Sequence, residues 1–219
     1  MEKNNLMILS TALFLSIMIF TGANCSNSDS ANTNGKVKNA QDTIKTNKLS
    51  AEKANEELAK LAITIGPEDA KTTIIEASDL ECPACKSTHT EFAKTVDKYK
   101  DSVKFGYLPY PLSYHPNALL AAYAIEAANL QEKGWEMHDK LFEAQTLDEN
   151  SINTLAQELE LNMDQFKIDI DSDTVKQKIN DSKALLDELG LTGTPTFYIN
   201  GIEYQRSPSF ANLSIEIEK

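Results

Sequence analysis

The sequence predicts an α/β fold in which a β-α-β unit is separated by a block of helices from a C-terminal β-hairpin and helix. Residues 72–78 have the β-branched composition of a buried strand. Residues from about 116 to 189 show the apolar spacing of helices. Asn200-Gly201, which lies between two apolar runs, is a strong short-range signal for a hairpin turn.

The β-α-β unit follows from local patterns. Pro83 permits a helix to begin immediately after residue 82, and Phe92, Val96 and Tyr99 continue it with a spacing of three to four residues. Residues 102–108 read as a second strand, which ends before a proline-rich turn.

The remaining elements are also expected from spacing and capping residues. Helices are predicted at residues 49–62, 117–130, 135–142, 152–161, 163–170, 174–189 and 210–217, and hairpin strands at 196–199 and 202–204. Trp135 and Phe142 are interpreted as core residues of the helical block. The three histidines, His89, His115 and His138, are interpreted as surface or capping residues rather than ligands.

Charge and cysteine content exclude two classes of protein. The chain has 219 residues and a formal net charge of −12, which disfavours a general nucleic-acid binder because phosphate backbones require basic surface. Three cysteines are too few for a disulfide-dense scaffold. We therefore expect one folded domain, at residues 49–219, with its helical insertion at about 116–189.

The N-terminal segment predicts export. Residues 6–20 are an apolar run that would span roughly 22 Å as a helix, which is short of a membrane core and fits a signal peptide at residues 1–24. Cys25 follows at the place of a lipid-modified cysteine, although cleavage after Ala23 would leave it a free thiol. Residues 25–48 are polar and predict a flexible tether to a membrane.

Cys82 and Cys85 form a Cys-x-x-Cys pair between a predicted strand and a predicted helix. Cys82 would lie near the unpaired N–H groups of the helix start, which favour a thiolate, so it is the expected nucleophile. Cys85 lies one helical turn later and can resolve a mixed disulfide formed at Cys82. The spacing therefore indicates thiol–disulfide exchange.

Three other interpretations of this pair fit the sequence less well. A zinc site would need a second pair of ligands, and His89 is the nearby candidate. Attachment of a c-type haem would need histidine directly after the second cysteine, where the chain has Lys86. A purely structural disulfide would close too short a loop to contribute much stability. No metal and no cofactor are therefore expected.

Three segments together resemble the DsbA-like thioredoxin-fold oxidoreductases. They are Glu-Cys-Pro-Ala-Cys-Lys at 81–86, Tyr-Pro-Leu-Ser-Tyr-His-Pro-Asn-Ala at 110–118, and Gly-Thr-Pro-Thr-Phe-Tyr-Ile-Asn-Gly at 193–201. The resemblance extends from about residue 65 to the C-terminus and is strongest to the branch of BdbD-type disulfide formation proteins. It implies a thioredoxin fold with a helical insertion between the βαβ half and the C-terminal ββα half.

The resemblance also implies roles for further residues. Pro195 matches the cis-proline that faces the dithiol and helps to dock substrate, and Thr194 precedes it. Glu76 matches the buried acid beneath the dithiol and is expected to shuttle protons for Cys85. Ala84 departs from DsbA itself, which has histidine there, so Cys82 should be less strongly stabilised as a thiolate.

The function expected from this resemblance is the donation of disulfides to reduced or unfolded exported proteins in a bacterial cell envelope. Reoxidation is expected from a quinone-linked membrane partner of the DsbB or VKOR type, with lipidated Cys25 as the membrane anchor. A second interpretation is an exported reductant or isomerase, although the polar stretch before residue 49 leaves no room for the added domain of the family's isomerases. A third is a non-catalytic surface-binding lipoprotein, which the intact cysteine pair disfavours.

Overall fold

The computed structural model of the protein describes residues 49–219. The predicted signal peptide, the predicted tether and Cys25 lie outside the described residues. Within the described part of the chain, no helix combines the length and the apolar character needed to cross a membrane.

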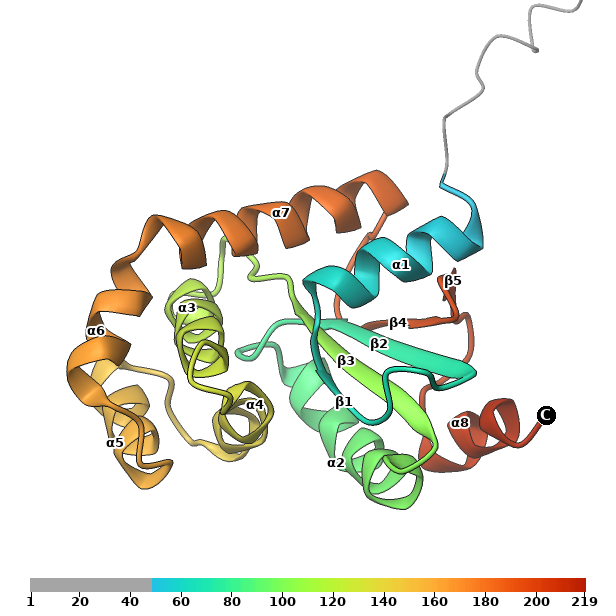
Figure 1. The fold of residues 1–219 in the computed structure, drawn as a ribbon, viewed down its shortest axis with the longest axis horizontal. Coiled ribbons are helices and arrows are strands. Elements are labelled where there is room, and N and C mark those ends of the chain that lie inside the picture. The colour runs from blue at the N-terminus through green and yellow to red at the C-terminus, as the bar shows by residue number, and fades with distance from the viewer. Residues whose placement is uncertain (1–48) are drawn as a thin grey trace, which may run out of the picture. The chain divides into compact units, whose positions relative to one another are not determined.

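A five-stranded mixed sheet forms the centre of the described chain (Figure 1). Its strands are β1 (Ile63–Ile65), β2 (Thr72–Ser78), β3 (Val103–Pro109), β4 (Thr196–Ile199) and β5 (Ile202–Glu203), in the spatial order β1-β3-β2-β4-β5. The central pair, β2 and β3, is parallel, and the other neighbouring pairs are antiparallel.

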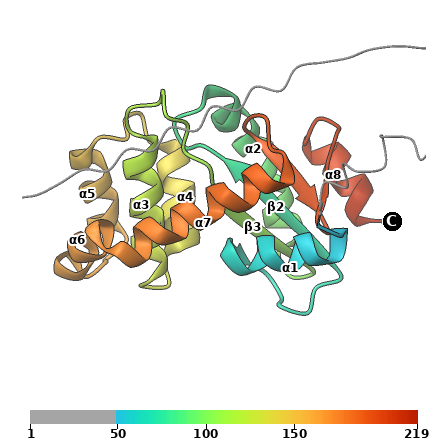
Figure 2. The same cartoon turned by 90° about the horizontal axis from the view of Figure 1, so that it is seen from above.

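Helices cover both faces of this sheet. Helices α1 (Ala51–Leu61) and α7 (Asp173–Leu189) pack on one face, and α2 (Pro83–Tyr99) and α8 (Phe210–Ile217) pack on the other (Figures 1 and 2). Successive residues of a strand point to opposite faces, and the whole of β2 beyond its first residue is buried. A strand covered on both sides explains why its sequence is a continuous β-branched run rather than an alternating one.

The helical block lies between β3 and β4 in the sequence. It consists of α3 (Ala118–Asn129), α4 (Gly134–Glu143), α5 (Glu149–Glu158) and α6 (Met163–Asp171), and α7 returns the chain to the sheet (Figure 1). Its apolar core is continuous with both cysteines of the 82–85 pair. The predicted α/β class, with helices inserted between the two halves of a sheet, is therefore confirmed.

Local signals predicted most element boundaries, with two differences. The hairpin turn forms at Asn200 and Gly201, whose φ angles of 49° and 76° are those that an Asn-Gly turn favours. Helix α5 (Glu149–Glu158) begins and ends three residues earlier than expected. The side chain of Asp148 caps its start by accepting a hydrogen bond from the backbone N–H of Ser151. Strand β1 was not predicted, since three residues are too few to show a period.

Candidate active site

The two cysteines lie at the start of α2, directly beyond the carboxyl end of β2. The backbone N–H of Cys82 donates to the carbonyl of Asp79 at 3.1 Å, which closes the turn that leads into the helix. Cys82 is the N-cap residue, and Pro83 is the first helical residue, where a missing N–H costs nothing. Both cysteines are buried, and no disulfide joins them to another described residue.

A buried carboxylate fixes the loop that precedes the dithiol. Asp79 accepts hydrogen bonds from the backbone N–H groups of Glu81 at 2.7 Å and Leu112 at 2.8 Å, and its Oδ2 lies 2.9 Å from Nδ1 of His115. Glu81 in turn accepts from the backbone N–H of Asn117 at 2.7 Å. These contacts join the dithiol loop to the loop after β3. Sequence reasoning gave Asp79 no role, although a polar residue directly after a buried strand is a usable signal.

The loop before β4 packs against the outer cysteine. The Thr194–Pro195 peptide bond is cis, and Sγ of Cys82 lies 3.8 Å from the carbonyl oxygen of Thr194, toward which its thiol points as a donor. The Oγ1 of Thr196 donates to the carbonyl of Gly193 at 2.7 Å and so closes this loop. The fold thus brings together segments that are 112 residues apart in the sequence.

The two thiols have different electrostatic environments. Burial opposes ionisation of Cys82, but the backbone N–H of Cys85 and the side chain of Thr194 favour its thiolate, and the net effect lowers the pKa of Cys82 below its ordinary value. Burial raises the pKa of Cys85 to about 12, against smaller opposing contributions that begin with the side chain of Ser78. Proton loss is therefore favoured at the outer sulfur and disfavoured at the inner one.

Glu76 lies in the middle of β2, beside Tyr107 of β3 and Phe197 of β4. Its side chain is fully buried, and neither carboxylate oxygen has a hydrogen-bond partner. Burial, with a smaller contribution from the charge of Asp139, raises the pKa of Glu76 to about 8 against the opposing effect of the Ser78 side chain. Tyr107 packs in the same buried cluster as Cys85, and burial together with the charges of Glu76 and Cys85 raises its pKa, so the acid and the inner thiol both lie near this side chain. This carboxyl can therefore hold a proton near neutral pH.

The interpretation of His89 and His138 as surface or capping residues is wrong. Both side chains are buried, with His89 on α2 and His138 on α4, because the helical block packs α4 against α2 and the sheet. Burial lowers the pKa of His89 to about 4. Phe142 is buried as expected, whereas Trp135 is only partly buried. Among the described residues, His89, His138 and Asp139 form a group with the composition of a metal site.

The comparisons with known proteins agree with this geometry. The family model described as Thioredoxin matches residues 58–219. The chain belongs to the thioredoxin family.

Within that family, the chain resembles proteins of disulfide formation. It is 28% identical over 169 residues to the probable disulfide bond formation protein D of Bacillus anthracis, covering 71% of this chain and 76% of that protein. It matches the crystal structure of oxidised BdbD from Bacillus subtilis with a TM-score of 0.63 and 25% identity, over 73% of this chain and 92% of that one. The predicted DsbA-like, BdbD-type relationship is confirmed, and these similarities support thiol:disulfide oxidoreductase activity.

A second group of relatives is much longer than this chain. The Na(+)/H(+) antiporter NhaA 3 of Salinispora tropica is 34% identical over 154 residues, which cover 69% of this chain but 24% of the antiporter. The chain thus spans about a quarter of the length of the antiporters that it matches.

Proposed function

We propose that this chain is an exported thiol:disulfide oxidoreductase that donates disulfides to secreted or envelope proteins through Cys82 and Cys85. The observation that carries the proposal is the asymmetry of the two thiols. Cys82 lies at a helix N-terminus against the Thr194–Pro195 loop, whereas Cys85 is fully buried one turn later. A disulfide exchange enzyme needs this division between a sulfur that meets the substrate and a sulfur that resolves the intermediate.

The first step starts from the oxidised enzyme. A substrate thiolate attacks Sγ of Cys82, a new S–S bond joins substrate and enzyme, and the Cys82–Cys85 bond breaks. The electron pair of the broken bond leaves on Cys85, which takes up a proton because burial holds its pKa near 12. Glu76 is proposed as the source of that proton, since its own carboxyl stays protonated up to about pH 8.

The second step releases the product. A second substrate thiolate attacks the substrate sulfur of the mixed disulfide, the substrate disulfide forms, and Cys82 leaves as a thiolate. Two electrons have then passed from the substrate to the enzyme dithiol. The lowered pKa of Cys82 favours this step because a stabilised thiolate is the better leaving group.

Thr194 and Pro195 are proposed to frame the substrate. Because proline has no backbone N–H, residue 195 offers no backbone hydrogen-bond donor at the edge of this loop. An extended substrate backbone could then align with the backbone groups of the loop and bring its cysteine to Sγ of Cys82. The 3.8 Å contact between Cys82 and the Thr194 carbonyl supports this placement.

The enzyme needs an oxidant to complete its cycle. We propose reoxidation of the dithiol by a quinone-linked membrane protein of the DsbB or VKOR type, in a bacterial envelope to which lipidated Cys25 would anchor the chain. The similarity to disulfide bond formation proteins supports this direction of electron flow.

The reduction potential of the Cys82–Cys85 pair tests the direction. The full chain carrying Cys25→Ser, which removes the third thiol, is equilibrated in glutathione buffers and its thiols are counted by alkylation and mass. We expect a potential between about −180 and −120 mV, the oxidising end of the dithiol scale. A potential near about −270 mV would instead make the protein an exported reductant, which the absence of histidine at position 84 would then explain.

A further inference from the structure

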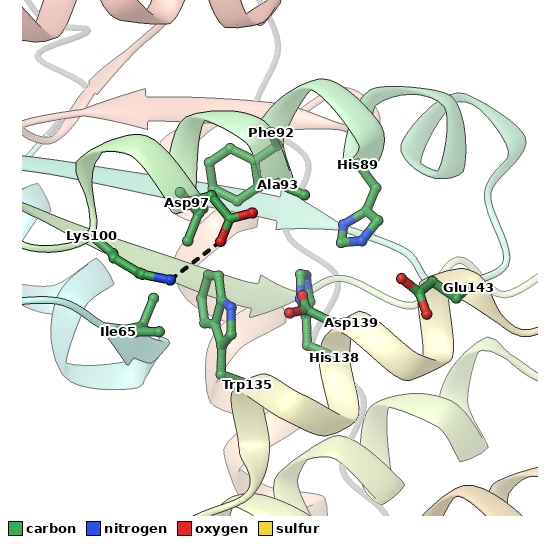
Figure 3. A pocket seen from close by; sticks show the side chains of 11 residues that line it. Ile65, His89, Phe92, Ala93, Asp97, Lys100, Trp135, His138, Asp139 and Glu143 are labelled. Carbon is green, nitrogen blue, oxygen red and sulfur yellow. Dashed lines mark hydrogen bonds and ion pairs between the residues drawn. The ribbon is translucent and has the colours of Figure 1, made fainter.

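Two buried histidines lie close together between α2 and α4, with ring centroids 5.3 Å apart. His89 lies one helical turn beyond Cys85, and His138 lies on α4 with Asp139 beside it (Figure 3). One ring nitrogen of each histidine and a carboxylate oxygen of Asp139 all lie within 4.8 Å of one another. The helical block therefore assembles an imidazole–imidazole–carboxylate group from segments that are about fifty residues apart in the sequence.

Both rings carry a buried nitrogen without a partner. Nδ1 of His89 and Nε2 of His138 are inaccessible to solvent and make no hydrogen bond. An unsatisfied buried polar atom costs about 1–3 kcal/mol, so two in one cluster need an explanation. A cation bound between the rings would use both lone pairs.

Aromatic packing holds the two rings in place. His89 stacks on Phe142 with ring centroids 4.5 Å apart and an interplanar angle of 15°. His138 packs on Tyr107 at 4.6 Å and on Trp135 at 5.0 Å. Because the neighbouring rings restrict both imidazoles, their nitrogen positions are largely pre-organised before any ligand arrives.

Asp139 determines which nitrogen of His138 is free. Its Oδ1 lies 2.8 Å from Nδ1 of His138, and an ionised carboxylate only accepts hydrogen bonds, so Nδ1 carries the proton and Nε2 keeps its lone pair. A carboxylate that orients a histidine in this way is the usual companion of a metal-binding imidazole. Because Nε2 lies on the far side of the ring from this carboxylate, Asp139 would orient His138 rather than bind the same ion.

The cluster opens into a cavity of about 260 Å³. Figure 3 shows Asp97, Asp139 and Glu143 lining this cavity together with one lysine, Lys100, which pairs with Asp97 at 3.3 Å. The lining thus carries more negative than positive charge, which favours a cation. The cavity also has room for water molecules that would complete a coordination shell.

We propose that His89 and His138 bind one divalent transition-metal ion of the Zn²⁺ class through Nδ1 and Nε2, the two nitrogens without partners. Asp139 is a positioning residue that orients His138. Imidazole suits this class of metal, and water or the carboxylate of Glu143, which also lines the cavity, would complete a four-coordinate site.

The test must prevent the thiols from binding the metal. The full chain carrying Cys25→Ser, Cys82→Ser and Cys85→Ser is dialysed against Zn²⁺ alone, and the bound metal is counted. We expect one ion per chain and, with Co²⁺ in place of Zn²⁺, the visible absorption of a four-coordinate site. His89→Gln should lose this ion, and Asp139→Asn should bind it about 10- to 100-fold more weakly.

The third histidine provides the matched control. His115 lies in the loop after β3, where it contacts Asp79, and does not line the cavity, so His115→Gln should keep full binding. His138 is fully buried, so its substitution could unfold the protein, and the test therefore uses His89→Gln and Asp139→Asn. Circular dichroism checks that both variants fold. Absence of stoichiometric binding, or equal binding by the parent, His89→Gln and Asp139→Asn, would overturn the proposal. Since this parent has no thiols, neither result bears on the proposed oxidoreductase function.

Discussion

The outer side of the dithiol, formed by Cys82, Thr194 and Pro195, contrasts with its inner side, formed by Cys85 and Glu76. On the outer side, Sγ of Cys82 lies 3.8 Å from the carbonyl oxygen of Thr194, and the N–H groups of the first helical turn lower the pKa of Cys82. On the inner side, Cys85 and Glu76 are completely buried, and burial raises the pKa of both groups.

This difference shows how one helical turn separates two roles for the same functional group. Unpaired N–H groups at a helix N-terminus stabilise an anion, whereas an apolar interior destabilises it. Cys82 experiences both effects, and its hydrogen-bond donors together outweigh burial, whereas Cys85 experiences mainly the second. The outer sulfur is therefore suited to carry charge during exchange, and the inner sulfur and carboxyl are suited to carry protons.

The largest expected effect comes from removing the outer sulfur. In a buffer in which oxidised glutathione regenerates the enzyme disulfide, Cys82→Ser should reduce the oxidation of a two-cysteine peptide to the uncatalysed rate, because without Cys82 no Cys82–Cys85 disulfide can form to accept the two electrons. Peptide oxidation is followed by mass. Cys25→Ser serves as the control and should retain full turnover. Turnover by Cys82→Ser above the uncatalysed rate would contradict the division between the two sides.

Removing the inner sulfur should have a different consequence. Cys85→Ser should also lose turnover, because it cannot form the Cys82–Cys85 disulfide. When it is given a disulfide-bonded peptide, the Cys82 thiolate should attack that disulfide, one peptide sulfur should leave as a thiolate, and the mixed disulfide should accumulate because no thiol at position 85 can resolve it. Non-reducing electrophoresis and mass mapping would identify the linked cysteine. A mixed disulfide on position 85 in the Cys82→Ser variant, at a comparable rate, would show that the two sulfurs are equally accessible.

The buried carboxyl should make stability depend on pH. The folded protein keeps the Glu76 proton up to about pH 8, whereas the ordinary pKa of a free glutamate side chain is 4.5. The folded state therefore binds more protons than the unfolded state between these values, and the free energy of unfolding falls as pH rises, by up to about 1.4 kcal/mol per pH unit.

Glu76→Gln should abolish that slope. The free energy of unfolding of wild type and variant is measured with urea on the oxidised, chelator-treated proteins at several pH values between 5 and 8. Taking the difference between the two proteins cancels the contributions of other titrating groups. The stabilisation of the wild type relative to the variant should shrink steadily toward high pH. A difference that stays constant would mean that the Glu76 carboxyl is not held protonated.

The smallest expected effect concerns the exposed Ala84 on the outer side. Ala84→His would place an imidazolium near the Cys82 thiolate and lower the pKa of Cys82 by about one unit. That change corresponds to a rise of about 30 mV in the reduction potential, because the reduced form becomes more stable. The thiolate absorbance and the glutathione titration measure the two quantities. Ala84→Gln is the neutral control and should leave both unchanged.

The sequence predicted those features that depend on neighbouring residues. The β-branched run of β2, Pro83 at the start of α2 and the Asn200-Gly201 turn each have a local cause, and each appears in the structure as expected. The Cys-x-x-Cys spacing likewise predicted the dithiol at a helix N-terminus. In these cases, backbone geometry and helix capping act over a few residues, so one segment contains the information.

Only the tertiary structure decided what surrounds the polar side chains. Local spacing could assign His89 and His138 to helices, but the burial of both rings depends on how the helical block packs against α2 and β3. In the same way, Asp79 has three hydrogen-bonding partners while the equally buried Glu76 has none. The sequence by itself determined the elements and the dithiol, and the packing of distant segments determined burial and partners, because desolvation and hydrogen bonding depend on which side chains meet in space.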